Sequence, residues 1–413
     1  MKNPWVWLGL WAGLSLTCVG GEIPRPAEKA PVEKVAWERA VLRGVDFLLK
    51  RQNRDGSWGS PRQTKHLNIY APGSSHDGYR TGTTALVLES LLRTEQFLQT
   101  LPRQGLSEEL QTLLSRKEEL TEAIDRCENW LLEHLPQLRR SSPDVLYNNW
   151  GHAYGLQALK GMGERKVSLP AAELAQRHDS IREQMRKQVE LLQRFECLDG
   201  GWCYYDFDFQ TQKTAGSSLS FMTATVLVGL ADARDFGVDV PEVLVRRGID
   251  SILRQRRPDG AYAYGEYLIR FPASINQPQG SLGRSQACHE ALLRWGRSDV
   301  VTQQVLLDWM DRLMAQNGWL DIARKRPVPH ESHYQIAAYF YYYAHYYAAR
   351  NLAWLEKPED RGRLANHLVS LQLALQEKDG SWWDFPLYDY HPYYGTGMVL
   401  TSLLEAYPSL FGR

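Results

Sequence analysis

The sequence carries no excess of charge of either sign. Its 413 residues contain 48 Lys plus Arg and 48 Asp plus Glu. A balanced charge gives no electrostatic support for nucleic acid or an anionic membrane as a partner. The chain also lacks any convincing run of alternating apolar and polar residues, so we expect no β-sheet. The absence of alternating runs favours an all-α protein.

Long hydrophobic runs are missing except at the N-terminus. The stretch from Trp5 to Val19 is apolar and follows the basic Lys2. Its length is typical of a signal peptide and is short for a membrane span, which needs about 20 residues. We therefore expect residues 1–21 to be a signal peptide and residues 22–34 a flexible lead. Residues 35–413 would then form one exported domain without a transmembrane span.

Cysteine is scarce. Four cysteines would remain after signal removal, namely Cys127, Cys197, Cys203 and Cys288. Export permits disulfides, and Cys197 and Cys203 are the nearest pair because they flank one turn. Free buried thiols are at least as good an interpretation, since four cysteines allow three pairings and the sequence does not choose.

What the chain does contain is a repeat. The segment Gln52–Trp58 reads Q-x-x-D-G-S-W, and Gln376–Trp382 reads the same. Looser copies end at Trp202, Tyr262 and Trp319, at intervals of about 60 residues, which is typical of a repeated supersecondary unit. The Asp-Gly pair predicts a tight turn. The aromatic residue is expected to pack against the adjoining repeat.

Twelve helices are predicted from periodicity and end signals. They span residues 34–51, 81–99, 106–135, 150–163, 171–195, 217–235, 241–256, 284–296, 299–316, 333–351, 358–377 and 395–407. The odd members are charged and amphipathic, which suits an outer ring. The even members are poorer in charge and rich in small residues, which suits a buried inner ring. Six such pairs predict an (α/α)6 toroid whose long loops, from outer to inner helix, gather at one end.

The Q-x-x-D-G-S-W repeats on alternating helices resemble the squalene cyclase and protein prenyltransferase superfamily, over nearly the whole mature chain. The resemblance implies a toroid that binds a hydrophobic isoprenoid in its central cavity. Two departures concern the reaction. The D-x-D-D acid run of class II cyclases is present only in part, as Asp206-Phe207-Asp208-Phe209. The Asp-x-Cys zinc pair of prenyltransferases is matched only by Asp125-Arg126-Cys127, within a charged outer helix.

Catalytic candidates lie in the outer-to-inner loops and at the starts of inner helices. Asp206 and Asp208 are two carboxylates in an aromatic loop, where sharing protons raises one pKa enough for acid catalysis. Capping or solvated aspartates are the alternative interpretation. Asp389 and His391 lie in the densest aromatic cluster of the chain, and His152 lies near the start of another inner helix.

A larger set is expected to contact a substrate, because long loops on a rigid scaffold are where sites occur. The set is His76, Asp77, Tyr154, Arg284, His289, Glu290, Tyr334, Trp383 and Tyr390. His330 and His333 are considered as metal ligands. Hydrogen-bonded structural histidines are the commoner alternative, and no full ligand set is visible. No other cofactor is expected.

Three functions fit these patterns. The first is an enzyme that uses acid-base chemistry on an isoprenoid or similar lipid in an aromatic-lined cavity, with Asp206 or Asp208 as proton donor. The second is a secreted polysaccharide lyase or glycoside hydrolase, since paired carboxylates and aromatic platforms also serve carbohydrates. The third is a non-catalytic binding toroid. An apolar cavity favours the first function, an open polar cleft the second and a filled lumen the third.

Overall fold

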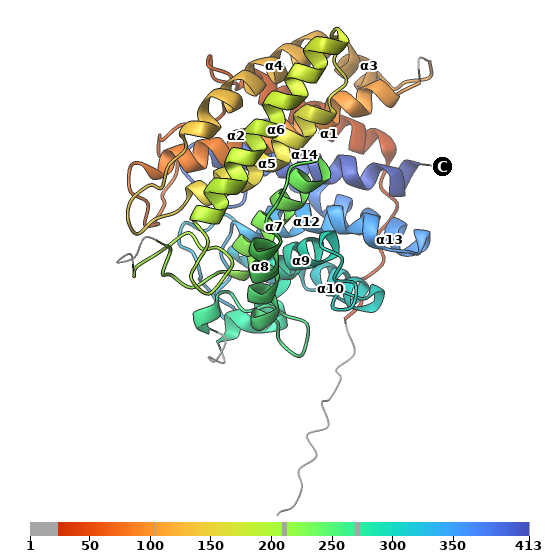
Figure 1. Ribbon diagram of the computed structural model, residues 1–413. Coiled ribbons are helices and arrows are strands. Elements are labelled where there is room, and N and C mark those ends of the chain that lie inside the picture. Colours follow the sequence, from red (N-terminus) through yellow and green to blue (C-terminus); the bar gives the residue numbers. More distant parts are fainter. Residues whose placement is uncertain (1–23, 103, 209–212, 269–272, 413) are drawn as a thin grey trace, which may run out of the picture.

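The computed structural model describes residues 24–102, 104–208, 213–268 and 273–412 (Figure 1). The predicted signal peptide lies outside these residues. The described residues form α-helices and short 3-10 turns and contain no β-strand, only isolated bridges. The all-α prediction is confirmed. No helix in these residues combines the length and apolarity needed to cross a bilayer.

The helices form two concentric rings. The inner ring consists of α2 (Ser75–Thr100), α5 (Asn148–Glu164), α7 (Ser220–Asp235), α9 (Pro278–Arg294), α12 (Phe340–Asn351) and α14 (His391–Phe411). The outer ring consists of α1 (Lys34–Lys50), α4 (Lys117–His134), α6 (Ala171–Arg194), α8 (Glu242–Gln255), α10 (Gln303–Ala315) and α13 (Pro358–Leu373). Two short helices, α3 (Glu108–Ser115) and α11 (Asn317–Ala323), are additional.

The ring closes. Each inner helix packs against the next, and α14 completes the circle by packing against α2. In the outer ring, the Gln376 amide after α13 donates to the Ala40 carbonyl of α1 at 3.0 Å. Figure 1 shows α1 and the C-terminal α14 near each other, and the Trp37 indole of α1 donates to the Leu403 carbonyl of α14. The predicted (α/α)6 toroid is therefore confirmed.

Close approach of the inner helices depends on small residues, as predicted. A Cβ at Gly229 of α7 would lie 2.7 Å from the Ala153 carbonyl oxygen of α5. A Cβ at Gly397 of α14 would lie 2.9 Å from the Leu86 carbonyl oxygen of α2. Since such distances leave no room for a side chain, glycine sets the spacing at both contacts.

The two Q-x-x-D-G-S-W segments make the same contacts. The Trp58 indole donates to the Leu48 carbonyl at 2.9 Å, and the Trp382 indole donates to the Gln372 carbonyl at 2.8 Å. The glycine of each motif has positive φ, as its turn requires. Trp58, Trp202 and Trp382 are fully buried, whereas Trp319 is 36% exposed. The structural role predicted for Trp319 is wrong, because Trp319 lies on the short helix α11 at the surface.

Several helix boundaries differ from the prediction. The expected helix 106–135 is divided at Arg116 into α3 and α4. The helix expected from residue 333 begins only at Phe340, because His330, Ser332 and Gln335 have positive φ, which no α-helix permits. The helices expected from residues 81 and 284 instead begin one to two turns earlier, at Ser75 and Pro278.

Two further expectations concern the lead and the cysteines. Part of the predicted flexible lead is held, since the Asn366 side chain of α13 bonds the backbone of Lys29, Ala30 and Val32. The four described cysteines are buried and free. The Cys197 and Cys203 sulfurs lie 3.4 Å apart without a disulfide.

Candidate functional site

A cavity of about 440 Å³ opens at the end of the toroid that carries the long loops. We call it the tyrosine cavity. Its walls come from the first turns of α2, α5, α7 and α14, from α12, and from the loops that precede inner helices. The lining residues are Asn68, Ile69, Tyr70, Gly78, Tyr79, Gly82, Thr83, Leu86, Tyr147, Trp150, Tyr154, Tyr204, Tyr205, Phe221, Pro329, His330, Tyr339, Tyr343, Phe385, Leu387, Tyr394 and Met398.

The wall of the tyrosine cavity is aromatic and carries no charge. Nine of its residues are tyrosines, and no Asp, Glu, Lys or Arg is among the described residues that line it. Burial raises the pKa of the lining phenols other than Tyr70, to about 12 for Tyr339, and the hydrogen bond to Asp144 raises the pKa of Tyr70. The hydroxyls are therefore neutral hydrogen-bond donors and acceptors. A surface of this kind suits an apolar ligand with few polar groups.

Four of the nine tyrosine hydroxyls in the wall are bonded to another tyrosine hydroxyl. The Tyr147 and Tyr205 hydroxyls lie 2.5 Å apart. Tyr264, just behind the wall, bonds the Tyr204 hydroxyl and lies 3.2 Å from the Tyr339 hydroxyl. These bonds join the loops that precede four inner helices, α5, α7, α9 and α12, and hold the aromatic rings in place.

His330 is the only described lining residue that titrates near neutral pH. Its Nδ1 lies 2.8 Å from the Gln335 carbonyl, which requires a proton on Nδ1. Burial lowers the pKa of His330, so the ring is neutral. The exposed His333 contacts Tyr334, and Glu331 pairs with Arg326. No group of three metal-ligating side chains is present in the part of the chain that the structure describes.

A buried carboxyl lies directly behind the wall. Tyr394, a residue of the cavity wall, donates its hydroxyl proton to Asp384 Oδ1 at 2.7 Å. The backbone amides of Tyr342 and Phe385 also donate to this carboxylate. Burial raises the pKa of Asp384 to about 6, although all three donors act in the opposite direction. Asp384 is not among the residues predicted from the sequence, where its one signal is its place in the aromatic segment before α14.

The predicted acid pair does not line the cavity. Asp206 is fully buried, pairs with Arg140 at 2.8 Å and accepts the Gly216 amide, so it anchors its loop. Asp208 is exposed to solvent. Phe207, expected to pack against the barrel, is 67% exposed, so the loop does not push the carboxylates into the lumen. Phe209 lies outside the described residues.

Several predicted contacts on inner helices face away from the cavity. His152 bonds Gln188 of the outer helix α6 at 2.7 Å, and His289 lies between Tyr262 and Trp309. Burial lowers their pKa values to about 4 and about 3. Arg284 is buried and donates to the backbone carbonyls of Tyr262 and Ile275, before α9, and of Gly280 in its first turn. The expectation that His152 and His289 share one cavity is therefore wrong.

The remaining candidates lie around the rim or below the cavity. His76 lies 3.4 Å from the Tyr390 hydroxyl, and Asp77 is exposed. Asp389 accepts from Ser60, and His391 bonds the Tyr388 carbonyl and contacts Trp383. Tyr334 contacts Trp319. Of the predicted residues, only Tyr154 and His330 line the tyrosine cavity. The other candidates at the rim or below the cavity stay predictions, as catalytic residues or substrate contacts.

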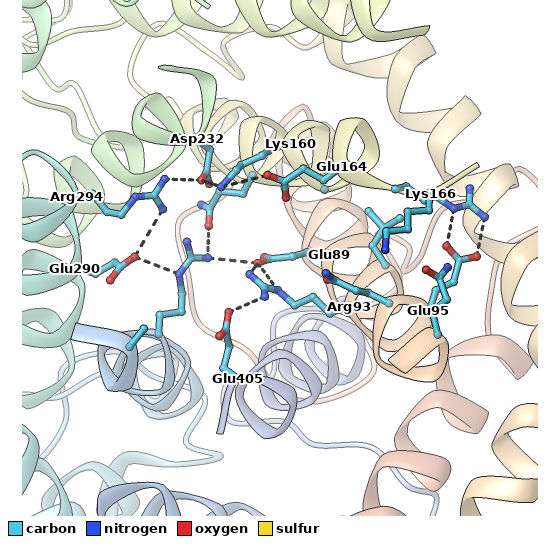
Figure 2. A pocket seen from close by; sticks show the side chains of 18 of the residues that line it. Glu89, Arg93, Glu95, Lys160, Glu164, Lys166, Asp232, Glu290, Arg294 and Glu405 are labelled. Carbon is cyan, nitrogen blue, oxygen red and sulfur yellow. Dashed lines mark hydrogen bonds and ion pairs between the residues drawn. The ribbon is translucent and has the colours of Figure 1, made fainter. Parts of the chain in front are cut away.

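The opposite end of the lumen is crossed by charged side chains, drawn in Figure 2. Arg350 of α12 is the centre of this group, which we call the ionic floor. It contacts Glu89 of α2 at 3.3 Å, Gln157 of α5 at 3.1 Å and Glu290 of α9 at 3.6 Å. Arg93, Arg294 and Glu405 continue the ion pairs. A second pocket, of about 300 Å³, lies against this floor, and each carboxylate that lines it pairs with an arginine or a lysine. Glu290, expected to bind substrate, belongs here.

Comparisons with known proteins find one partial sequence relative and several similar structures. No family model matches the chain. An α-2-macroglobulin from Thermotoga maritima is 24% identical over 231 residues, which are 56% of this chain and 12% of that protein. The type II terpene cyclase MstE from Scytonema is 16% identical, with a TM-score of 0.49 over 92% of this chain and all of the cyclase chain.

A solved cellobiose 2-epimerase from Bacillus thermoamylovorans is also similar. It has a TM-score of 0.52 and 11% identity, over 90% of this chain and 99% of the epimerase. This likeness and the closed double ring define the chain as an α/α toroid protein. At such low identity the comparison concerns the fold alone.

Proposed function

We propose that the protein is an exported enzyme that binds an isoprenoid, or a similarly apolar lipid, in the tyrosine cavity and acts on it by proton transfer. The observation that carries this proposal is a cavity at the loop end with twelve aromatic residues and no charged group in its described wall. Burial of an apolar chain against such a wall is favourable. Tyrosine and tryptophan faces also stabilise a developing cation.

The proton route in this proposal is the Asp384–Tyr394 pair. When Asp384 is protonated, Tyr394 gives its hydroxyl proton to the substrate and takes the proton of Asp384, so the charge ends on the carboxylate. The reverse transfer removes a proton from the substrate. A pKa of about 6 suits both directions near neutral pH, because a useful acid-base group has a pKa close to the working pH.

Glycoside chemistry is less well supported by this cavity. Most glycosidases use two carboxyl groups that flank the reacting bond. The described wall supplies none, and the second pocket offers only carboxylates that are already paired with arginine or lysine.

Ligand binding is tested with geranylgeraniol, squalene and cellobiose. Trp150 lies in the wall, so its fluorescence should change when either isoprenoid binds. Leu387 is a half-exposed residue of the wall, and Leu387→Asp should weaken isoprenoid binding at least about tenfold by placing a charge beside the ligand. The matched control is Leu198→Asp, at a residue that is 52% exposed and outside the cavity. Binding of cellobiose alone, or equal effects of both variants, contradicts the proposal.

Turnover is tested in D₂O with the same isoprenoids. Asp384→Asn should bind them with little change but give no rearranged, deuterium-containing product, because an amide cannot supply the proton. Asp208→Asn should retain full activity, since Asp208 is exposed and is not one of the described residues that line the cavity. Products that form equally fast in Asp384→Asn would remove this residue from the mechanism.

A further inference from the structure

Two hydroxyls in the tyrosine cavity lack a hydrogen bond. Tyr79 and Tyr154 are 7% and 4% exposed, and neither hydroxyl has a partner of normal geometry. Both residues line the cavity. A buried polar group is almost always paired in a folded protein. Two unpaired hydroxyls in one cavity therefore point to a partner that is not part of the chain.

The neighbouring phenols do not remove this requirement. Tyr147 and Tyr347 lie near enough to Tyr79 and Tyr154 to affect their pKa values. No hydrogen bond of normal geometry joins either pair of phenols. The Tyr347 hydroxyl bonds Thr225 at 3.1 Å, and the Tyr147 hydroxyl bonds Tyr205. Burial also raises the pKa of Tyr79 and Tyr154 well above the usual value, so both stay protonated and each keeps a hydrogen to donate.

The two hydroxyls belong to different depths of the cavity. A Cβ at Gly78 would lie 2.8 Å from the Tyr147 carbonyl, and one at Gly82 would lie 3.7 Å from the Gly151 amide, so α2 and α5 run in parallel at this register. Tyr79 is thus level with Asn148, six residues before Tyr154. At about 1.5 Å of rise per residue, Tyr154 lies roughly 9 Å deeper.

We infer that the natural ligand is an oxygenated apolar molecule rather than a pure hydrocarbon, with Tyr154 donating to an oxygen at its buried end and Tyr79 donating to a second oxygen nearer the mouth. The inference rests on the proposed function and adds a ligand class and two specificity-determining residues. An apolar body fills the aromatic wall, while the oxygens satisfy hydroxyls that otherwise stay unpaired. Neither residue belongs to the proton route of Asp384 and Tyr394.

The experiment compares two ligands of equal chain length, farnesol and β-farnesene, of which only the first carries a hydroxyl. Affinity is measured for the wild type, Tyr154→Phe, Tyr79→Phe and Tyr341→Phe. Tyr341 is the matched control, because it is a buried tyrosine that does not line the cavity and whose hydroxyl already accepts from Asn317. Melting temperatures of the ligand-free proteins are recorded as well.

The wild type should prefer farnesol about tenfold. Because farnesol has a single hydroxyl, one of the two variants Tyr154→Phe and Tyr79→Phe should remove that preference while leaving the affinity for β-farnesene unchanged. Without ligand, these two variants should melt no lower than the wild type, since each deletes an unpaired hydroxyl. Tyr341→Phe should keep the preference for farnesol.

Two results overturn the inference. One is equal binding of both ligands in every variant. The other is a lowered melting temperature in Tyr154→Phe and Tyr79→Phe while both variants still prefer farnesol. That result would show that the two hydroxyls bond Tyr147, Tyr347 or a structural water in the ligand-free protein. Failure of the wild type to bind either ligand instead contradicts the proposed function itself.

Discussion

Replacing His289 by leucine should stabilise the protein and reduce its sensitivity to acid. His289 is fully buried on α9, and neither ring nitrogen has a hydrogen-bond partner within the described chain. Burial lowers its pKa to about 3, with Arg256 adding to the effect. An imidazole in this position must remain neutral for the chain to stay folded.

The sign and size of the effect follow from proton linkage. In the unfolded chain a histidine has a pKa of about 6.5. As the pH falls below that value, His289 is protonated in the unfolded state but stays neutral in the folded state until about pH 3. Stability is therefore lost between about pH 6.5 and pH 3. At pH 5 the loss is about 2 kcal/mol relative to pH 7. At pH 7, His289→Leu should add about 1–3 kcal/mol by removing two unpaired buried nitrogens.

Urea unfolding at pH 7 and pH 5, followed by far-UV circular dichroism, measures both quantities. The variant should lose about 2 kcal/mol less than the wild type between the two pH values. The control His333→Leu changes an exposed histidine and should alter neither value. Identical pH dependence in His289→Leu and wild type would show that His289 is not held neutral in the core.

Three further predictions concern the ring and its floor. Trp382→Ala should lower the free energy of unfolding by about 3–5 kcal/mol, whereas Trp319→Ala should change it by less than about 1 kcal/mol; equal losses would contradict the packing described for Trp382. Arg350→Ala should lower the free energy of unfolding in urea by about 3–5 kcal/mol, because it leaves Glu89 and Glu290 buried without their shared cation. An unchanged urea midpoint would show that the ionic floor does not stabilise the protein. Deleting residues 379–413 should abolish cooperative unfolding of the whole domain, and a folded remainder would show that the repeats are stable as an open array.

The sequence predicted the ring because its signals are local. Helix periodicity, the Asp-Gly turns and the glycine-rich inner helices each depend on a few neighbouring residues. The return of Gln52–Trp58 as Gln376–Trp382 placed the first and last repeats side by side. The errors in helix boundaries also arise because these signals are local. The segment before Phe340 has a helical composition, and only its positive φ angles exclude a helix.

The site was harder to predict because the inner helices are apolar on nearly every face. Trp150 and Tyr154 are four residues apart, stack at 5.9 Å and face the lumen. His152 lies between them in sequence and points to the outer ring. Residues two apart on a helix differ by about 200° in direction, and an all-apolar helix gives no pattern that tells lumen from outer ring. Loop position therefore predicted the end of the toroid at which the tyrosine cavity opens but not which side chains line that cavity.

The most direct test of the account is a crystal structure of the protein with geranylgeraniol. If the tyrosine cavity is the functional site, electron density for the isoprenoid chain should lie between Trp150, Tyr154 and Met398. The ligand hydroxyl should then lie within hydrogen-bond distance of Tyr154 or Tyr79. Density only in the charged pocket beside Arg350, or an empty tyrosine cavity at saturating ligand, would contradict the claim that this cavity is the functional site.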